Sequence, residues 1–118
     1  MNLEHARHNM IEQQIRTWEV LDQSVLDLLY VVRREEFVPV AYRELAFSDL
    51  EIPLTPSGSA RGECMLHPKI EARVLQEVAP RKTDRVLEIG AGSGYMAALL
   101  GARAAGVVSI EINPLLAQ

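Results

Sequence analysis

Residues 85–101 read RVLEIGAGSGYMAALLG. A short apolar run, alternating glycines and a second apolar run indicate a strand, a tight loop and a helix. Residues 107–110 read VVSI and indicate a further strand, because β-branched side chains favour extended backbone. Two strands connected by a helix form a βαβ unit with parallel strands. The sequence therefore predicts an α/β fold.

Gly90, Gly92 and Gly94 follow the end of the first predicted strand. Ligands of open α/β sheets bind beyond the carboxyl ends of the strands, and glycine lets the backbone turn sharply and approach a ligand closely. The dinucleotide fingerprint needs its third glycine one position later, where this chain has Tyr95. The spacing therefore favours a ligand other than a dinucleotide. The alternative is that the glycines only permit a tight turn.

Two acidic residues flank the glycine loop. Glu88 lies inside the first strand, and Glu111 ends the second strand, where an acid can accept hydrogen bonds from both hydroxyl groups of a ribose. This arrangement resembles the S-adenosylmethionine site of class I methyltransferases. The resemblance implies that S-adenosyl-L-methionine is the cofactor. The cofactor-binding residues that it implies are Glu88, Gly90, Gly92, Gly94 and Glu111.

The resemblance extends along nearly the whole chain. Residues 34–39 (REEFVP), 46–49 (AFSD) and 86–95 (VLEIGAGSGY) are similar to segments of protein-L-isoaspartate O-methyltransferases. The resemblance implies a repair reaction, in which a methyl group passes from the cofactor to a carboxylate of an isoaspartyl residue in a damaged protein. Because a carboxylate is already nucleophilic, this transfer depends mainly on alignment of the reacting atoms and exclusion of water. It requires no metal ion.

One segment departs from the family pattern. The family has T-I-S-x-P before the helix that precedes its first strand, and this chain has CMLHP at residues 64–68. Leu66 stands at the serine position, which in the family lies at the substrate carboxylate, and leucine cannot form a hydrogen bond there. Either His67 or the backbone amides of residues 58–62 replace the serine, or the substrate differs. The catalytic residue stays unknown, and methyl transfer to an isoaspartyl peptide is expected to be weak.

Several other residues have a structural explanation beside a functional one. His67 is expected to cap the start of a helix, and Cys64 to fill space without a partner that would activate its thiol. Arg34 either binds an acidic substrate or lies at a solvated helix end. Tyr95 either lines the cofactor pocket or packs at the start of the helix that follows the glycine loop. None of these is assigned a catalytic role.

Three other functions stay open. A nucleotide-dependent oxidoreductase would also use a glycine loop, although Tyr95 counts against it. A homologue that binds the cofactor without catalysis would account for Leu66. A methyltransferase with a small-molecule acceptor would also account for Leu66.

Two sections of the domain are expected. Residues 1–84 are predicted to form a helical and loop section, and residues 85–118 the start of a Rossmann-like cofactor-binding section. Helical spacing predicts that Ile11, Ile15 and Trp18 form a buried stripe.

The starts of two further helices are indicated by capping residues. Asp22 is a good N-cap, and Leu21 and Leu26 are spaced as a hydrophobic staple around it. Pro68 suits the first position of another helix. The residues expected to form the buried stripe of that helix are Ile70, Val74, Leu75 and Val78. Between the two helices, residues 51–54 are expected to be extended.

Composition narrows the class of protein. The chain has 118 residues, 48% of them hydrophobic, and a formal net charge of −4. This is typical of a globular domain, and no apolar run approaches the roughly 20 residues that span a bilayer. The acidic balance counts against a nucleic-acid partner, and the single cysteine and three histidines have no metal-ligand spacing. A cytoplasmic protein without a membrane or nucleic-acid partner is expected.

Length adds one expectation. The family resemblance implies a seven-stranded sheet with the first predicted strand at its centre, covered on both faces. This chain offers two strands of that sheet. We therefore expect an apparently truncated N-terminal portion that is inactive alone and either self-associates through open sheet edges or is marginally stable.

Overall fold

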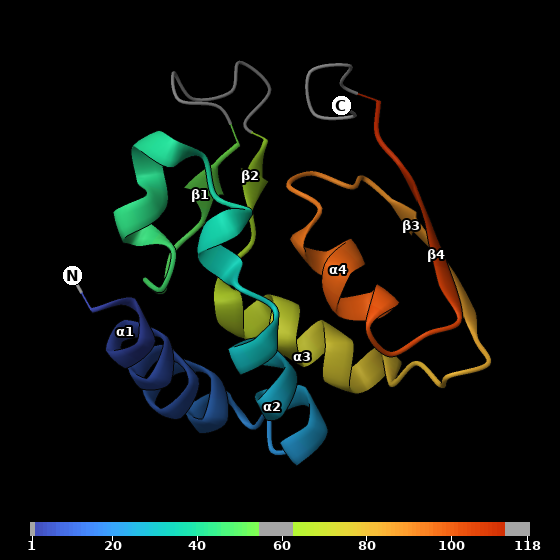
Figure 1. Ribbon diagram of the computed structural model, residues 1–118, viewed down its shortest axis with the longest axis horizontal. Coiled ribbons are helices and arrows are strands. Elements are labelled where there is room, and N and C mark those ends of the chain that lie inside the picture. The colour runs from blue at the N-terminus through green and yellow to red at the C-terminus, as the bar shows by residue number, and fades with distance from the viewer. Residues whose placement is uncertain (1, 55–62, 113–118) are drawn as a thin grey trace.

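The computed structural model describes residues 2–54 and 63–112. Towards the end of the second range, two strands pair in parallel. β3 (Arg85–Ile89) pairs with β4 (Gly106–Ile110), and α4 (Tyr95–Gly101) connects them (Figure 1). Because the pairing is parallel, both strands end at the same edge. The predicted α/β unit is confirmed, and the glycine loop lies at the carboxyl end of its first strand.

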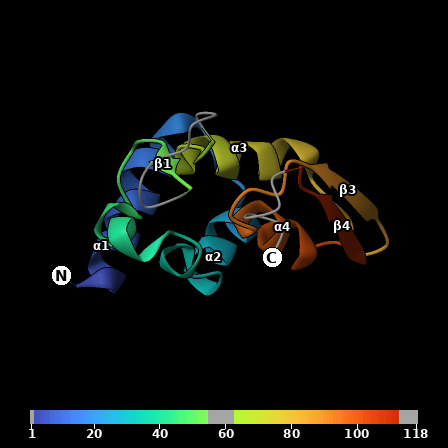
Figure 2. The same cartoon turned by 90° about the horizontal axis from the view of Figure 1, so that it is seen from above.

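Helices form the rest of the fold. α1 (Leu3–Met10) continues into a π-helical turn at Ile11–Ile15 and a 3-10 turn at Arg16–Trp18, and α2 (Gln23–Val31) follows. α3 (Pro68–Val78) lies between α1 and the β3–β4 pair in both views (Figures 1 and 2). None of the described helices is long and apolar enough to cross a membrane.

Short elements connect α2 to α3. Two 3-10 turns, Arg34–Glu36 and Val40–Leu45, are followed by the strands β1 (Ile52–Pro53) and β2 (Cys64–Met65). These two strands pair in antiparallel orientation. The predicted extended segment at 51–54 is therefore confirmed, and β2 leads directly into α3.

Apolar side chains from the helices and from β1 form the hydrophobic core. Each helix contributes one face, as expected of amphipathic helices, and removal of this apolar area from water is the dominant favourable contribution to folding. The most deeply buried of these side chains are Met10, Ile11, Ile15, Val20, Val25, Leu26, Ile52, Ala72, Leu75 and Leu99.

Ile11 and Ile15 are buried as predicted, but the predictions for Trp18 and Leu21 are wrong. Trp18 is 43% exposed, and the amino group of Lys69 lies 5.3 Å from its ring centroid. The π-helical turn has more residues per turn than an α-helix, which rotates the later side chains away from the buried face. Leu21 is 65% exposed and forms no staple with Leu26. Its backbone amide instead donates to Oε1 of Gln76 at 2.8 Å.

The helix starts are predicted correctly, but the buried face of α3 is not. Asp22 accepts a hydrogen bond from the Ser24 amide, and Pro68 is the first residue of α3. Val74 is 40% exposed and Val78 54%. Leu75 is buried as predicted, and the other buried side chains of α3 belong to Pro68, Glu71 and Ala72. The buried face of α3 includes Glu71 because the buried side chain of Arg34, which lies outside this helix, pairs with it.

Within the described residues, the β3–β4 pair is covered on one face only. Val86 and Val107 pack against the core. On the other face Leu87 is 60% exposed, Ile89 77% and Val108 64%. In the described part of the chain, each strand also pairs on one side only. A continuous apolar face therefore lies open along β3 and β4.

Candidate functional site

The glycine loop follows β3 in a backbone conformation that L-amino acids with side chains rarely adopt. Gly90, Gly92 and Gly94 have φ angles of +85°, +56° and +86°. The amides of Gly90 and Ala91 donate to the carbonyl of Ile110, at 2.7 and 3.2 Å, which fixes the loop against the end of β4. The sequence-based reason for glycine at these positions is thus met by the observed geometry.

A cavity of about 240 Å³ opens beside this loop. A methyl group added to Gly90 would meet no atom within 4 Å, so the backbone there is open to a ligand. Other parts of the wall come from β2, α3, β3 and α4. The lining residues are Cys64, Met65, Leu66, Glu71, Val74, Glu88, Ile89, Gly90, Ala91, Gly92, Ser93 and Met96.

The structure brings some of the predicted binding residues into this cavity and leaves others beside it. Glu88 lines it and accepts a hydrogen bond from the Ser109 hydroxyl at 2.9 Å. Glu111 does not line it, and its carboxylate accepts a hydrogen bond from the Gly92 amide at 2.8 Å. Gly94 is the N-cap of α4, also outside the cavity lining. The role of Glu111 as a ribose acceptor stays a prediction.

Glu71 is a cavity residue that sequence reasoning missed. It is 6% exposed and faces the same cavity as Glu88. Burial raises the pKa of Glu71, the neighbouring Arg34 guanidinium opposes that rise, and the negative charge of Glu88 adds to it. No pattern within α3 signals the burial of Glu71, because its partner Arg34 lies 37 residues away in the sequence.

Arg34 is buried, which excludes the solvated helix end considered from the sequence. Its Nη1 donates to Oε1 of Glu71 at 2.5 Å, its Nη2 to the carbonyl of Leu66 at 2.9 Å and its Nε to the carbonyl of Ala46 at 2.8 Å. The guanidinium carbon lies 4.9 Å from the ring centroid of Tyr95. Arg34 therefore faces the interior and not an acidic substrate.

Tyr95 packs at the start of α4 and does not line the cavity. It is 1% exposed, and its ring centroid lies 5.5 Å from that of Phe37. Burial raises the pKa of Tyr95 well above its ordinary value, so the phenol is neutral. Of the two sequence-based interpretations, packing is the one observed.

The segment with the unusual leucine contributes to the cavity wall. Leu66 is 44% exposed at the cavity, and its carbonyl faces Arg34. His67 is the N-cap of α3, but its side chain makes no capping hydrogen bond, and its Nδ1 has no partner in the described part of the chain. His67 does not line the cavity. The other proposed substitute for the serine, the amides of residues 58–62, lies outside the described residues.

Neither a thiol nucleophile nor a metal centre is indicated. Burial raises the pKa of the Cys64 thiol, and its hydrogen bond to Glu51 raises it further, which favours the protonated form over the nucleophilic thiolate. Within residues 2–54 and 63–112, no group of three or more His, Cys, Asp or Glu side chains could hold a metal ion.

The fold and the cavity define an α/β protein with a cavity at the carboxyl end of its first parallel strand, where open α/β sheets bind their ligands. Residues 5–118 match the family model described as protein-L-isoaspartate(D-aspartate) O-methyltransferase. The chain belongs to this family.

Curated relatives are similar over most of the chain. A protein-L-isoaspartate O-methyltransferase 2 from Anaeromyxobacter sp. is 39% identical over 111 residues, which are 94% of this chain and 44% of the relative. Protein-L-isoaspartate O-methyltransferases from Koribacter versatilis and Herpetosiphon aurantiacus are 40% and 37% identical. The matched region is 89% of this chain and 45% of the Koribacter protein, and 98% of this chain and 49% of the Herpetosiphon protein. The chain thus spans about half the length of the curated relatives it matches.

Proposed function

We propose that the protein is an S-adenosyl-L-methionine-dependent O-methyltransferase and that its glycine-loop cavity binds the cofactor. One observation carries this proposal: in a member of this family, an open glycine loop with positive φ angles shares a cavity with Glu88. The residues that line the cavity fit S-adenosyl-L-methionine. The backbone at Gly90 is open, and the carboxylates of Glu88 and Glu71 suit a ligand that carries positive charge.

The proposed reaction transfers a methyl group to a carboxylate, in the family's reaction that of an isoaspartyl residue in a damaged protein. When bound, the cofactor supplies an electrophilic methyl group on a positively charged sulfur. The contribution of this chain is to orient and enclose: the glycine loop admits the ligand close to the backbone, and Met96 and Leu66 provide apolar walls that exclude water. An ionised acceptor carboxylate needs no general base.

Calorimetric titration with S-adenosylhomocysteine and, separately, with NAD tests the proposed cofactor. We expect S-adenosylhomocysteine to bind at a one-to-one ratio and NAD to show no binding at the same concentrations, because Tyr95 stands where the dinucleotide fingerprint needs glycine. Binding of NAD in preference to S-adenosylhomocysteine would instead support an oxidoreductase.

Leu66 favours an acceptor other than an isoaspartyl peptide, and it supports two alternatives: a small-molecule acceptor, or a homologue that binds the cofactor without catalysis. In the full-length protein, we expect slow methyl ester formation on an isoaspartyl peptide, and a roughly tenfold or greater increase in Leu66→Ser, because a hydrogen bond to a charged group is worth about 1.5–3 kcal/mol. Radiolabelled methyl transfer measures both rates.

The control for this experiment is Leu45→Ser, since Leu45 is similarly exposed, at 38% against 44% for Leu66, and does not line the cavity. Leu45→Ser should leave the rate unchanged. A fast rate with the unaltered protein would show that another group already replaces the serine of the family.

We also propose that β3 and β4 belong to a larger Rossmann-like sheet, supported by the apolar face that Leu87, Ile89 and Val108 leave exposed. The 118-residue chain alone is then expected to self-associate through this face and the open strand edges. Analytical ultracentrifugation should show a dimer or larger species that Leu87→Lys disperses. Val40→Lys is the control, because Val40 is 77% exposed on a turn away from the sheet. A monomer at about millimolar concentration would contradict the expectation.

A further inference from the structure

We propose that Arg34 is a positioning residue of the cofactor site, which holds one wall of the cavity against the start of α4. The inference rests on the proposed function, because it assigns a role at the same cavity. Arg34 does not line that cavity. It acts through Leu66 and Glu71, which do.

The hydrogen bonds of Arg34 join segments that are far apart in the sequence. Its guanidinium donates to the carbonyl of Leu66 at the end of β2, to Glu71 on α3 and to the carbonyl of Ala46 after the second 3-10 turn. Arginine is suited to this task because its planar guanidinium presents donors in several fixed directions. A lysine has the same charge but only one nitrogen, so it cannot reach all three acceptors together.

The face of the guanidinium makes the second connection. It lies against the ring of Tyr95, which is the first residue of α4 and directly follows Gly94. The Tyr95 amide donates to the Ser93 hydroxyl at 3.2 Å, and the Tyr95 ring also packs against Phe37, so the side chain helps to anchor this helix start. Arg34 therefore fixes the glycine loop relative to the wall formed by Leu66 and Glu71.

The positive charge of Arg34 also affects the ionisation of Glu71. Glu71 and Glu88 face the same cavity, and burial already raises the pKa of Glu71. The positive charge of Arg34 opposes that rise and favours an ionised Glu71. Loss of the arginine geometry would thus alter both the shape of the wall and the negative charge available to a cationic ligand.

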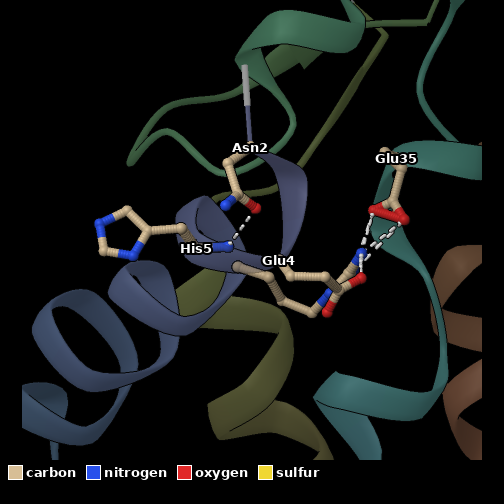
Figure 3. Close-up of polar contacts among 5 residues, drawn as sticks. Asn2, Glu4, His5 and Glu35 are labelled. Carbon is tan, nitrogen blue, oxygen red and sulfur yellow. Dashed lines mark hydrogen bonds and ion pairs between the residues drawn. The ribbon is translucent and has the colours of Figure 1, made fainter.

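Arg7 offers a matched control. Like Arg34, it is 1% exposed, pairs with a buried carboxylate, that of Glu35, and lies over an aromatic ring, that of Phe47. Figure 3 shows the Glu35 carboxylate in this pair. Arg7 does not line the cavity or bond to its walls, but it anchors the same short turn through Glu35. It therefore controls for general loosening of that turn.

The experiment compares Arg34→Lys with Arg7→Lys in the otherwise unaltered protein, after circular dichroism has shown that both are folded. Amide hydrogen exchange without ligand is the first readout. We expect Arg34→Lys to exchange about tenfold faster than the unaltered protein in residues 64–71 and 93–98, and Arg7→Lys to leave both segments unchanged. Equal exchange in the two variants, or no change in Arg34→Lys, would overturn the inference.

Binding of S-adenosylhomocysteine is the second readout. We expect the affinity to fall about tenfold in Arg34→Lys and less than twofold in Arg7→Lys. Unaltered affinity in Arg34→Lys would overturn the positioning role while leaving the proposed function intact. If the unaltered protein itself binds no S-adenosylhomocysteine, the proposed function fails, and the exchange result alone decides whether Arg34 holds the wall.

Discussion

Gly92→Val is expected to abolish binding of S-adenosylhomocysteine, with a loss of affinity of at least about 100-fold. Gly92 has a φ of +56°, and a side chain in this region costs about 1–3 kcal/mol, more for a β-branched residue. An added Cβ would also lie 3.6 Å from Cδ1 of Leu54, so the further valine methyl groups would crowd Leu54 or enter the cavity. Calorimetric titration measures the loss.

Gly106→Val is the control for this variant. Gly106 begins β4, has no positive φ and would meet no atom within 4 Å of an added Cβ, and valine favours extended backbone. We expect it to bind S-adenosylhomocysteine as the unaltered protein does. A Gly92→Val protein that is folded and retains full affinity would show that the ligand does not approach this loop.

Arg7→Met is expected to lower the free energy of unfolding by about 3–5 kcal/mol, because it leaves a buried carboxylate without its partner. Both Nη atoms of Arg7 donate to both carboxylate oxygens of Glu35, at 2.6 to 3.3 Å, and Glu35 is 5% exposed. Glu4 also pairs with Arg7, at 3.3 Å, but it is itself an acid and cannot replace Arg7 as the partner of Glu35. Urea denaturation measures the change.

The double variant Arg7→Met with Glu35→Leu separates the cost of an unpaired charge from the value of the pair. Replacing both members removes the stranded carboxylate, and we expect most of the lost stability to return. A double variant as unstable as Arg7→Met would mean that the arginine acts through its packing on Phe47.

The features that the sequence predicts correctly are those with local signals. The βαβ unit follows from two short apolar runs around alternating glycines, and the cap at Asp22 depends on a contact two residues away. The cavity position of Glu88 follows in the same way from its place in β3, just before the loop. In each case the residues that determine the structure are neighbours in the chain.

The features that sequence reasoning misses depend on distant partners. Glu71 is buried because Arg34, 37 residues away, pairs with it, and no pattern within α3 reveals that partner. The face of α3 is misassigned for the same reason: Val74 and Val78 look like core residues until Glu71 is known to point inward. Trp18 is misassigned because a single π-helical turn changes the helical period before it.

The hydrogen bond from the Gly92 amide to Glu111 bears on which ligands the loop rejects. Glycine loops that bind phosphates do so through unpaired backbone amides. Here a carboxylate already engages one of those amides, so an approaching phosphate meets electrostatic repulsion where it needs a donor. We therefore expect this carboxylate to disfavour a phosphate at the Gly92 amide, while a ligand that brings no phosphate to this position escapes the penalty.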